Sequence, residues 1–171
     1  ADFIGMKPRM SVAVGDTVKR GETLFEDRSA PGVLYTAPAA GTIKAIHRGE
    51  RRVLRSVVID LSESERNQTP GADECQRFEA FSGRPVEEMN GDDVESLLLE
   101  SGLWTALRQR PFSKVPAPGS RPGAIFVNAM DTHPLAPDMD VVLTEAQDDL
   151  DRGLSALKLL SEGKTYLCRK S

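Results

Sequence analysis

Five residues within eleven positions carry side chains suited to binding another molecule. Two are aromatic and three are cationic: Trp104, Arg108, Arg110, Phe112 and Lys114. Tryptophan and arginine are favoured anchors at interfaces, because each joins a large contact area to directional polar groups. The cluster therefore predicts a contact surface. The alternative is that Trp104 and Phe112 fill an internal cavity while the cations face solvent, and the residue types leave both interpretations open.

Acid–base chemistry has weaker candidates. His133 lies two positions after Asp131 and titrates near neutral pH, so the two could exchange a proton. The simpler interpretation is that Asp131 caps its loop and His133 is exposed. Glu26 and Asp27 are adjacent, and neighbouring residues of a strand point to opposite faces, which disfavours a shared proton.

A basic patch follows one of the expected strands. His47 lies beside Arg48, Arg51 and Arg52. These residues suit an acidic partner or lipid head groups, and a solvated turn explains them equally.

Several catalytic and cofactor motifs are missing from the sequence. No G-x-G-x-x-G or P-loop pattern indicates a nucleotide site, and no G-x-S-x-G elbow surrounds a serine. The two histidines and two cysteines have no metal-ligand spacing. Cys75 and Cys168 are expected to be free thiols, as in cytosolic proteins.

Composition narrows the class of protein. The 171 residues are 39% hydrophobic and 28% charged, with a net charge of −4 and a pI near 5.3, values that disfavour nucleic-acid binding. No apolar run reaches the roughly 18 residues of a membrane-spanning helix. The N-terminus does not have the pattern of a signal peptide. Because the chain lacks an initiator methionine, and because residues 166–171 read as an interrupted strand, we expect a fragment of a longer protein.

Residues 1–62 are expected to form a small β-barrel. Apolar–polar alternation between glycine-containing turns predicts short strands at 11–14, 23–25, 33–36, 41–46 and 53–59. Gly15 and Gly21 suit turn positions with positive φ. Residues 14–24 and 36–43 resemble the two halves of a biotinyl/lipoyl-like β-barrel, the barrel-sandwich hybrid. The hairpin between them, residues 26–32, lacks the lysine to which such carriers attach their cofactor.

The second half has a different periodicity. Residues 63–84 are polar and read as a linker or excursion, and residues 85–171 as a Rossmann-like α/β domain truncated at its C-terminus. An apolar helical pattern ends at Ser101–Gly102, a continuous apolar strand follows at 124–129, a second helix at 143–161 and a strand from 165. Strand, helix and strand in this order predict a parallel sheet. The whole chain is thus α+β and multi-domain.

Taken together, several segments resemble the A-subunit family of bacterial Na⁺-translocating NADH:quinone oxidoreductases. They are Gly5-Met6-Lys7-Pro8, Leu24-Phe25-Glu26-Asp27, residues 36–41, residues 101–108, residues 110–116 and Ala129-Met130-Asp131-Thr132. More distantly, the α/β half is similar to the flavin-carrying subunit of complex I and to the C subunit of the Rnf complex.

In the complex I relative, a glycine-rich loop after the first helix cradles the FMN phosphate. Here residues 103–113 contain no glycine, and Trp104, Leu107 and Phe112 carry bulk. The loop at residues 128–134 lacks the relatives' acidic pair. The resemblance therefore implies a flavin fold whose site is filled with side chains, with no cofactor, metal or catalytic residue on this chain.

The resemblance also implies a setting. The chain would be a peripheral subunit on the cytoplasmic face of the inner membrane, bound to the other subunits, including membrane subunits. The holoenzyme would use NADH, ubiquinone, flavins, an iron–sulfur centre and Na⁺, and the Trp104–Lys114 cluster would contact another subunit or a quinone head group. The alternative is a lysine-less carrier-type barrel acting as a protein-interaction module. A carrier with a swinging cofactor and a free-standing flavin or quinone enzyme fit less well, since the lysine and the glycine loop are missing.

Overall fold

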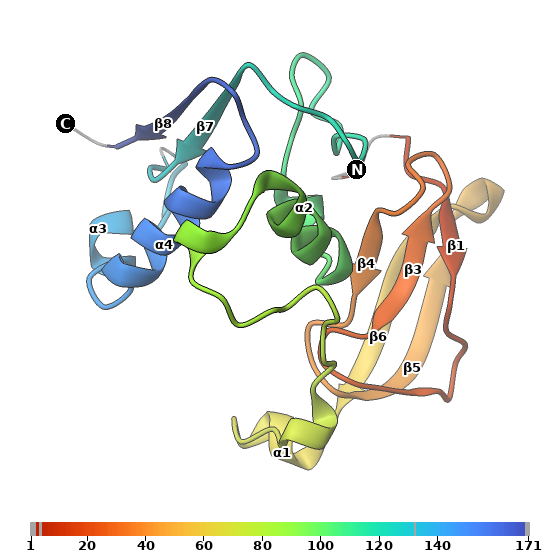
Figure 1. The fold of residues 1–171 in the computed structure, drawn as a ribbon. Helices are drawn as coiled ribbons and strands as arrows, with labels where there is room; N and C mark the ends of the chain where they lie inside the picture. Colours follow the sequence, from red (N-terminus) through yellow and green to blue (C-terminus); the bar gives the residue numbers. More distant parts are fainter. Residues whose placement is uncertain (1–2, 4, 132, 170–171) are drawn as a thin grey trace. The chain divides into compact units, whose positions relative to one another are not determined.

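A computed structural model describes residues 3, 5–131 and 133–169. The chain divides into two compact units (Figure 1): Ala1–Phe81 with Leu97–Pro118, and Ser82–Ser96 with Gly119–Ser171. The division falls within helix α2 (Gly91–Glu100). Residues 63–81, which the sequence suggested as part of a linker or excursion, belong to the first unit.

Two three-stranded antiparallel sheets form the barrel of the first unit (Figure 1). The first sheet has the order β1-β3-β4 and the second the order β2-β5-β6. Their bounds are β1 Pro8–Met10, β3 Thr23–Asp27, β4 Leu34–Thr36, β2 Thr17–Val18, β5 Gly41–Arg48 and β6 Leu54–Leu61. The barrel-sandwich prediction is confirmed.

The barrel core is small and apolar. It contains Val18, Leu24, Phe25, Ala37 and Ile43, which come from both sheets and from the turn after β4. Their burial removes apolar surface from water, the main favourable contribution to folding.

Glycines make two of the barrel's turns, as the sequence predicts. Gly15 has φ +97° and Gly21 has φ +87°, conformations that cost glycine little. One strand prediction is wrong, since residues 11–14 are not a strand and β1 begins at Pro8 instead. The reason is local: the Asp16 carboxylate accepts from Ala13 N (2.8 Å) and Asp16 N donates to Ala13 O (3.2 Å), which closes a turn there.

The hairpin tip between β3 and β4 is fixed by a buried carboxylate. Asp27 accepts from Lys7 N at 3.0 Å, from Ser29 N at 2.9 Å and from Ser29 Oγ at 2.6 Å. Burial alone would raise the pKa of Asp27, but these hydrogen bonds hold that pKa below its ordinary value.

The polar segment after β6 folds back on the barrel. It forms α1 (Glu63–Arg66) and a 3-10 turn, η2 (Ala72–Glu74). Glu65 is buried, pairs with the Arg20 guanidinium and accepts from Ala40 N at 2.8 Å. A buried carboxylate needs such partners, because an unpaired charge is costly to remove from water.

The second unit holds the parallel strands β7 (Ala124–Asn128) and β8 (Lys164–Cys168). They pair from Ala124 with Lys164 to Asn128 with Cys168, which confirms the expected parallel sheet. Between them lie α3 (Met139–Val142) and α4 (Gln147–Lys158); η3 (Val86–Glu88) precedes α2.

Two expectations for this unit need correction. The second helix begins at Gln147 rather than at residue 143, because Leu143 ends α3 and residues 143–146 form a turn. The apolar strand is not fully buried either, since Phe126 is largely exposed. A continuous apolar run does not itself say how many faces of a strand are covered.

Candidate interaction site

The loop that holds the candidate residues begins where α2 ends. Gly102 has φ +80°, the left-handed conformation that commonly terminates helices. The preceding carbonyl, Ser101 O, accepts from Thr36 Oγ1 at 2.9 Å. A 3-10 turn, η4 (Leu103–Ala106), follows directly, and Thr105 Oγ1 donates to Gly102 O at 2.7 Å. The loop is therefore held to β4 at its first residues.

Trp104 lies on the interior side of this loop. Its side chain is 2% exposed, and Nε1 donates to Pro116 O at 2.9 Å. A buried indole normally needs such an acceptor. Trp104 thus joins the two ends of the loop and is not available as a surface anchor.

Phe112 differs from Trp104, because its side chain is 71% exposed. The expectation that it fills a cavity is wrong. It belongs to a tight turn closed by Gln109 N donating to Lys114 O at 2.7 Å, with a cis peptide bond between Arg110 and Pro111. The turn presents an aromatic ring between two exposed cations, Arg110 and Lys114.

Arg108 has a different role from the other two cations. Its guanidinium lies 4.7 Å from the centroid of the Phe3 ring and donates to Thr105 O and Leu107 O. Arg108 therefore braces the loop. Phe3 is a partner that the sequence did not reveal, since no local spacing relates two residues so far apart.

Sequence prediction thus placed five residues together, and the structure separates them by role. Trp104 is internal and Arg108 is a brace. Arg110, Phe112 and Lys114, which we call the aromatic turn, are exposed. Among the described residues, no carboxylate forms an ion pair with either cation of the aromatic turn.

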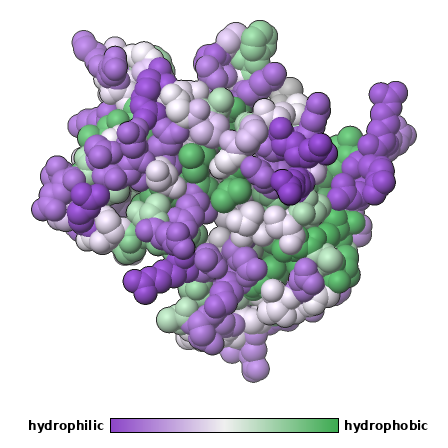
Figure 2. Space-filling model, turned by 45° about the vertical axis from the view of Figure 1, so that its right-hand side comes forward, coloured by the Kyte–Doolittle hydropathy of each residue, from purple (hydrophilic) through white to green (hydrophobic). Residues whose placement is uncertain are grey.

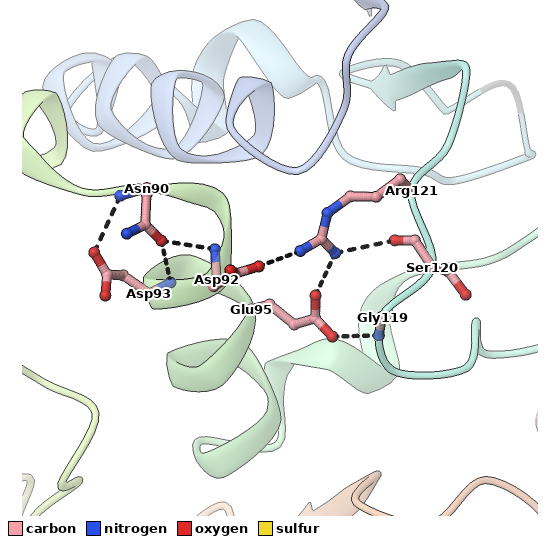
Figure 3. Close-up of polar contacts among 7 residues, drawn as sticks. All are labelled: Asn90, Asp92, Asp93, Glu95, Gly119, Ser120 and Arg121. Carbon is pink, nitrogen blue, oxygen red and sulfur yellow. Dashed lines mark hydrogen bonds and ion pairs between the residues drawn. The ribbon is translucent and has the colours of Figure 1, made fainter.

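The second unit offers no site for the phosphate of a flavin at the start of α2 (Figure 3). A helix N-terminus attracts anions through its free N–H groups. Here Asn90 Oδ1 accepts from Asp92 N and Asp93 N, both at 2.9 Å. The neighbouring Arg121 is paired with Asp92 and with the buried Glu95. The donors and the cation are already used by the chain's own groups.

The loop after β7 is acidic. Three carboxylates, Asp131, Asp138 and Asp140, line a shallow hollow there with Ala129, Met130 and residues 136, 137 and 139. Their negative charge repels a phosphate.

Asp131 and His133 meet in this loop. Asp131 Oδ1 accepts from His133 N at 2.9 Å and lies 2.5 Å from His133 Nδ1. These hydrogen bonds, the backbone one first, lower the pKa of Asp131. His133 is exposed, which suits a loop cap better than an enclosed proton-transfer pair. Thr132, part of the family-like segment 129–132, lies outside the described residues.

The described part of the chain holds neither a metal cluster nor a membrane-spanning helix. No group of three or more His, Cys, Asp or Glu side chains is arranged there to hold a metal ion. No helix among the described residues is long and apolar enough to cross a membrane. Both cysteines are free thiols, as expected.

Comparison with known proteins identifies the family. Residues 1–62 match the model of the NqrA N-terminal barrel-sandwich hybrid domain, and residues 89–171 match that of the NqrA second alpha/beta domain. The chain belongs to the NqrA family.

Three relatives in this family illustrate the similarity; each is named as the A-subunit of Na(+)-translocating NADH-quinone reductase. The chain is 51% identical to the protein of Neisseria meningitidis serogroup B (strain ATCC BAA-335 / MC58) over 168 residues, which are 98% of this chain and 36% of the relative. Identity to the Klebsiella pneumoniae (strain 342) protein is 49% over 170 residues, 99% and 36% of the two chains. Identity to the Yersinia pseudotuberculosis serotype O:1b (strain IP 31758) protein is 50% over 167 residues, 98% and 35%. The chain spans about a third of the length of these NqrA relatives.

Proposed function

We propose that the chain is the N-terminal part of a cofactor-free subunit of a Na⁺-translocating NADH:ubiquinone oxidoreductase. The subunit is peripheral and lies on the cytoplasmic face of the inner membrane. It acts in assembly of the complex, while NADH, flavins, the iron–sulfur centre and Na⁺ are handled by other subunits. Family membership supports the complex, and the glycine-free loop at residues 103–113, with Trp104 buried in it, supports the absence of a flavin here.

The observation that carries the assembly role is the exposure of Phe112. A phenylalanine ring that is 71% exposed on a closed turn, between Arg110 and Lys114, has the composition of an interface anchor. Buried Trp104 and bracing Arg108 fix the loop that carries it, so little conformational freedom is lost on binding. In the proposal, the aromatic turn inserts into a pocket of a neighbouring subunit.

The test uses the assembled complex from the organism that encodes this chain. Phe112→Ala is expected to lower the yield of intact complex at least tenfold under mild detergent, because a truncated anchor typically costs 2 kcal/mol or more, about thirtyfold in affinity. Phe81→Ala is the matched control, since Phe81 is 67% exposed in the same unit but lies outside the loop. Equal yields from the two variants would refute the assembly role.

A quinone contact is the competing role for the same turn. It predicts that Phe112→Ala leaves the complex intact and raises KM for a short-chain ubiquinone. Arg110→Gln and Lys114→Gln would then raise the same KM. Steady-state kinetics of the purified complex separate the two roles, because an assembly defect lowers the amount of active enzyme without changing KM.

A further inference from the structure

A second exposed turn in the first unit carries an unusual concentration of positive charge. It is the connection between β5 and β6, which projects beyond the strands of the barrel (Figure 1). Residues 44–55 contain five Lys or Arg and one carboxylate, Glu50, in a chain whose net charge is −4. We call four of these cations the arginine tip: Arg48, Arg51, Arg52 and Arg55.

The backbone of the tip is well defined. Gly49 N donates to Val53 O at 2.8 Å, Arg52 N to Gly49 O at 3.1 Å and Val53 N to Glu50 O at 3.2 Å. The 3-10 turn η1 (Glu50–Arg52) lies within these bonds. The tip is thus a closed turn that presents its side chains from a fixed position.

Arginine occupies positions that favour other residues. Arg51 has φ +54° and Arg52 has φ +61°, the left-handed region, which costs a residue with a Cβ about 1 kcal/mol or more. Glycine or asparagine would adopt it more easily. Backbone strain of this kind clusters at functional sites. Two strained arginines in succession therefore indicate that their side chains have a role.

The arginine tip has no internal neutralisation. Six other arginines of the described chain form ion pairs with carboxylates, namely Arg20, Arg66, Arg84, Arg121, Arg152 and Arg169. None of the four tip arginines has such a partner among the described residues. All four are exposed, and Arg48 Nη1 bonds only weakly, to Arg52 O at 3.2 Å. Four guanidinium groups are therefore available to external anions.

An apolar side chain completes the tip. Val53 is 61% exposed and lies between Arg52 and Arg55 in the sequence. Figure 2, in which the side drawn at the right of Figure 1 comes forward, shows long hydrophilic side chains projecting around smaller hydrophobic areas. A convex turn with an apolar residue among cations suits a soft surface that closes around it, whereas an acidic protein would have to supply a matching concave site.

We propose that the arginine tip binds the surface of an anionic phospholipid membrane. Guanidinium groups bind phosphate oxygens in pairs of parallel hydrogen bonds. The attraction of an anionic bilayer falls off within about a Debye length, roughly 8 Å at physiological salt, so the projecting position of the tip matters. This inference is independent of the proposed assembly role, because it uses other residues and another ligand.

The experiment uses the full-length subunit that contains this chain and vesicles of phosphatidylcholine with or without phosphatidylglycerol. Sedimentation is expected to show binding to the anionic vesicles alone. Each tip arginine contributes about a fivefold change in partition coefficient, so Arg51→Gln with Arg52→Gln should lower it about 25-fold. Adding Val53→Ser to this pair is expected to weaken binding further. Raised salt is expected to abolish the binding of the parent protein.

A second double variant separates the loss of charge from misfolding of the turn. Arg51→Gly with Arg52→Gly removes the same charges and relieves the left-handed strain, so the turn is kept or stabilised. This variant is expected to lose vesicle binding as the glutamine pair does. The matched control is Arg152→Gln with Arg169→Gln, which removes two exposed arginines elsewhere and should bind nearly as the parent does.

Several outcomes would overturn the proposal. Equal binding to neutral and anionic vesicles would overturn it, and so would undiminished binding by both tip variants. Loss of vesicle binding in millimolar inorganic phosphate, at unchanged ionic strength, would indicate a site for free phosphate. Loss of another subunit from the complex in the tip variants, with no vesicle binding by the parent, would assign the tip to an acidic protein instead.

Discussion

Phe126 and Tyr166 stack face to face across the two parallel strands of the second unit. Their ring centroids are 5.0 Å apart, their planes meet at 11°, and the two residues are direct partners in the register of β7 and β8. Both residues are exposed, Phe126 at 69% and Tyr166 at 44%. Each ring shields one face of the other from water, and the pair thereby stabilises the sheet.

This pairing predicts a coupling energy. Phe126→Ala and Tyr166→Ala should each destabilise β7 and β8, and their effects should fall short of additivity by about 0.5–1.5 kcal/mol, the usual contribution of an aromatic pair. Amide hydrogen exchange of the two strands in the four proteins measures it. Phe112→Ala should leave exchange in these strands unchanged, and strictly additive losses would contradict the stacking.

A second prediction concerns Trp104, the chain's single tryptophan. Because its indole is buried and bonded to Pro116 O, its fluorescence should be blue-shifted and poorly quenched by acrylamide. Trp104→Phe should lower the free energy of unfolding by about 1–3 kcal/mol, since a carbonyl loses its donor, and Trp104→Ala by about 3–5 kcal/mol. Chemical denaturation checks the order of the two losses, and an unchanged stability in Trp104→Phe would mean that the hydrogen bond contributes nothing.

Two glycines should respond to alanine with opposite signs. At Gly102 a Cβ would lie 2.6 Å from Thr36 Oγ1 on a backbone with φ +80°, so Gly102→Ala should destabilise by at least about 1 kcal/mol. At Gly153, inside α4, a Cβ would meet open space, so Gly153→Ala should stabilise by about 0.5–1 kcal/mol. Thermal unfolding of both variants is the measurement. A stabilising change at Gly102 would show that its left-handed conformation is not required.

The Arg20–Glu65 pair predicts a pH dependence. The pKa of Glu65 is held below its ordinary 4.5 by hydrogen bonds, the largest effect coming from the Arg20 side chain and the next from Ala40 N. A carboxyl whose pKa is lower in the folded state contributes stability that is present above 4.5 and is lost as pH falls through the folded pKa. Glu65→Gln should therefore destabilise the protein at neutral pH. It should also make the loss of stability with falling pH less steep.

Denaturation midpoints from about pH 7 to about pH 3 test this dependence, since that range spans the titration of a carboxyl. Glu63→Gln, which removes one exposed charge from the same helix, is the control. If the Glu65 variant declined in acid as steeply as the parent, another carboxyl would have to account for the loss.

Local patterns made much of the fold predictable. The turns at Gly15 and Gly21 require conformations that glycine supplies, and the order of strand, helix and strand after residue 120 leaves a parallel pair as the standard arrangement. Family-like segments such as residues 101–108 added the identity. These features depend on residues that are close in sequence.

What escaped prediction depends on distant partners. Strand β1 is set by its pairing with β3, which joins Pro8 to Asp27 at one end. The pattern of residues 8–10 alone does not predict a strand. Glu65 is held by Arg20, 45 positions away. The site illustrates the same limit, because hydrophobicity alone cannot tell that Trp104 is buried and Phe112 exposed. That difference depends on the loop's own hydrogen bonds, because Trp104 Nε1 donates to Pro116 O while Phe112 lies on the turn closed by Gln109 N and Lys114 O.

The carboxylate of Asp27 has a consequence for attempts to label or acylate this barrel. Because it clamps Lys7 and Ser29, the turn between β3 and β4 is a rigid platform and not a mobile arm. Arg28→Lys would place a primary amine on that platform without removing any bond of the clamp. A group joined there could travel no farther than the lysine side chain itself allows, so the engineered barrel would display its cargo at one place and could not shuttle it between distant sites.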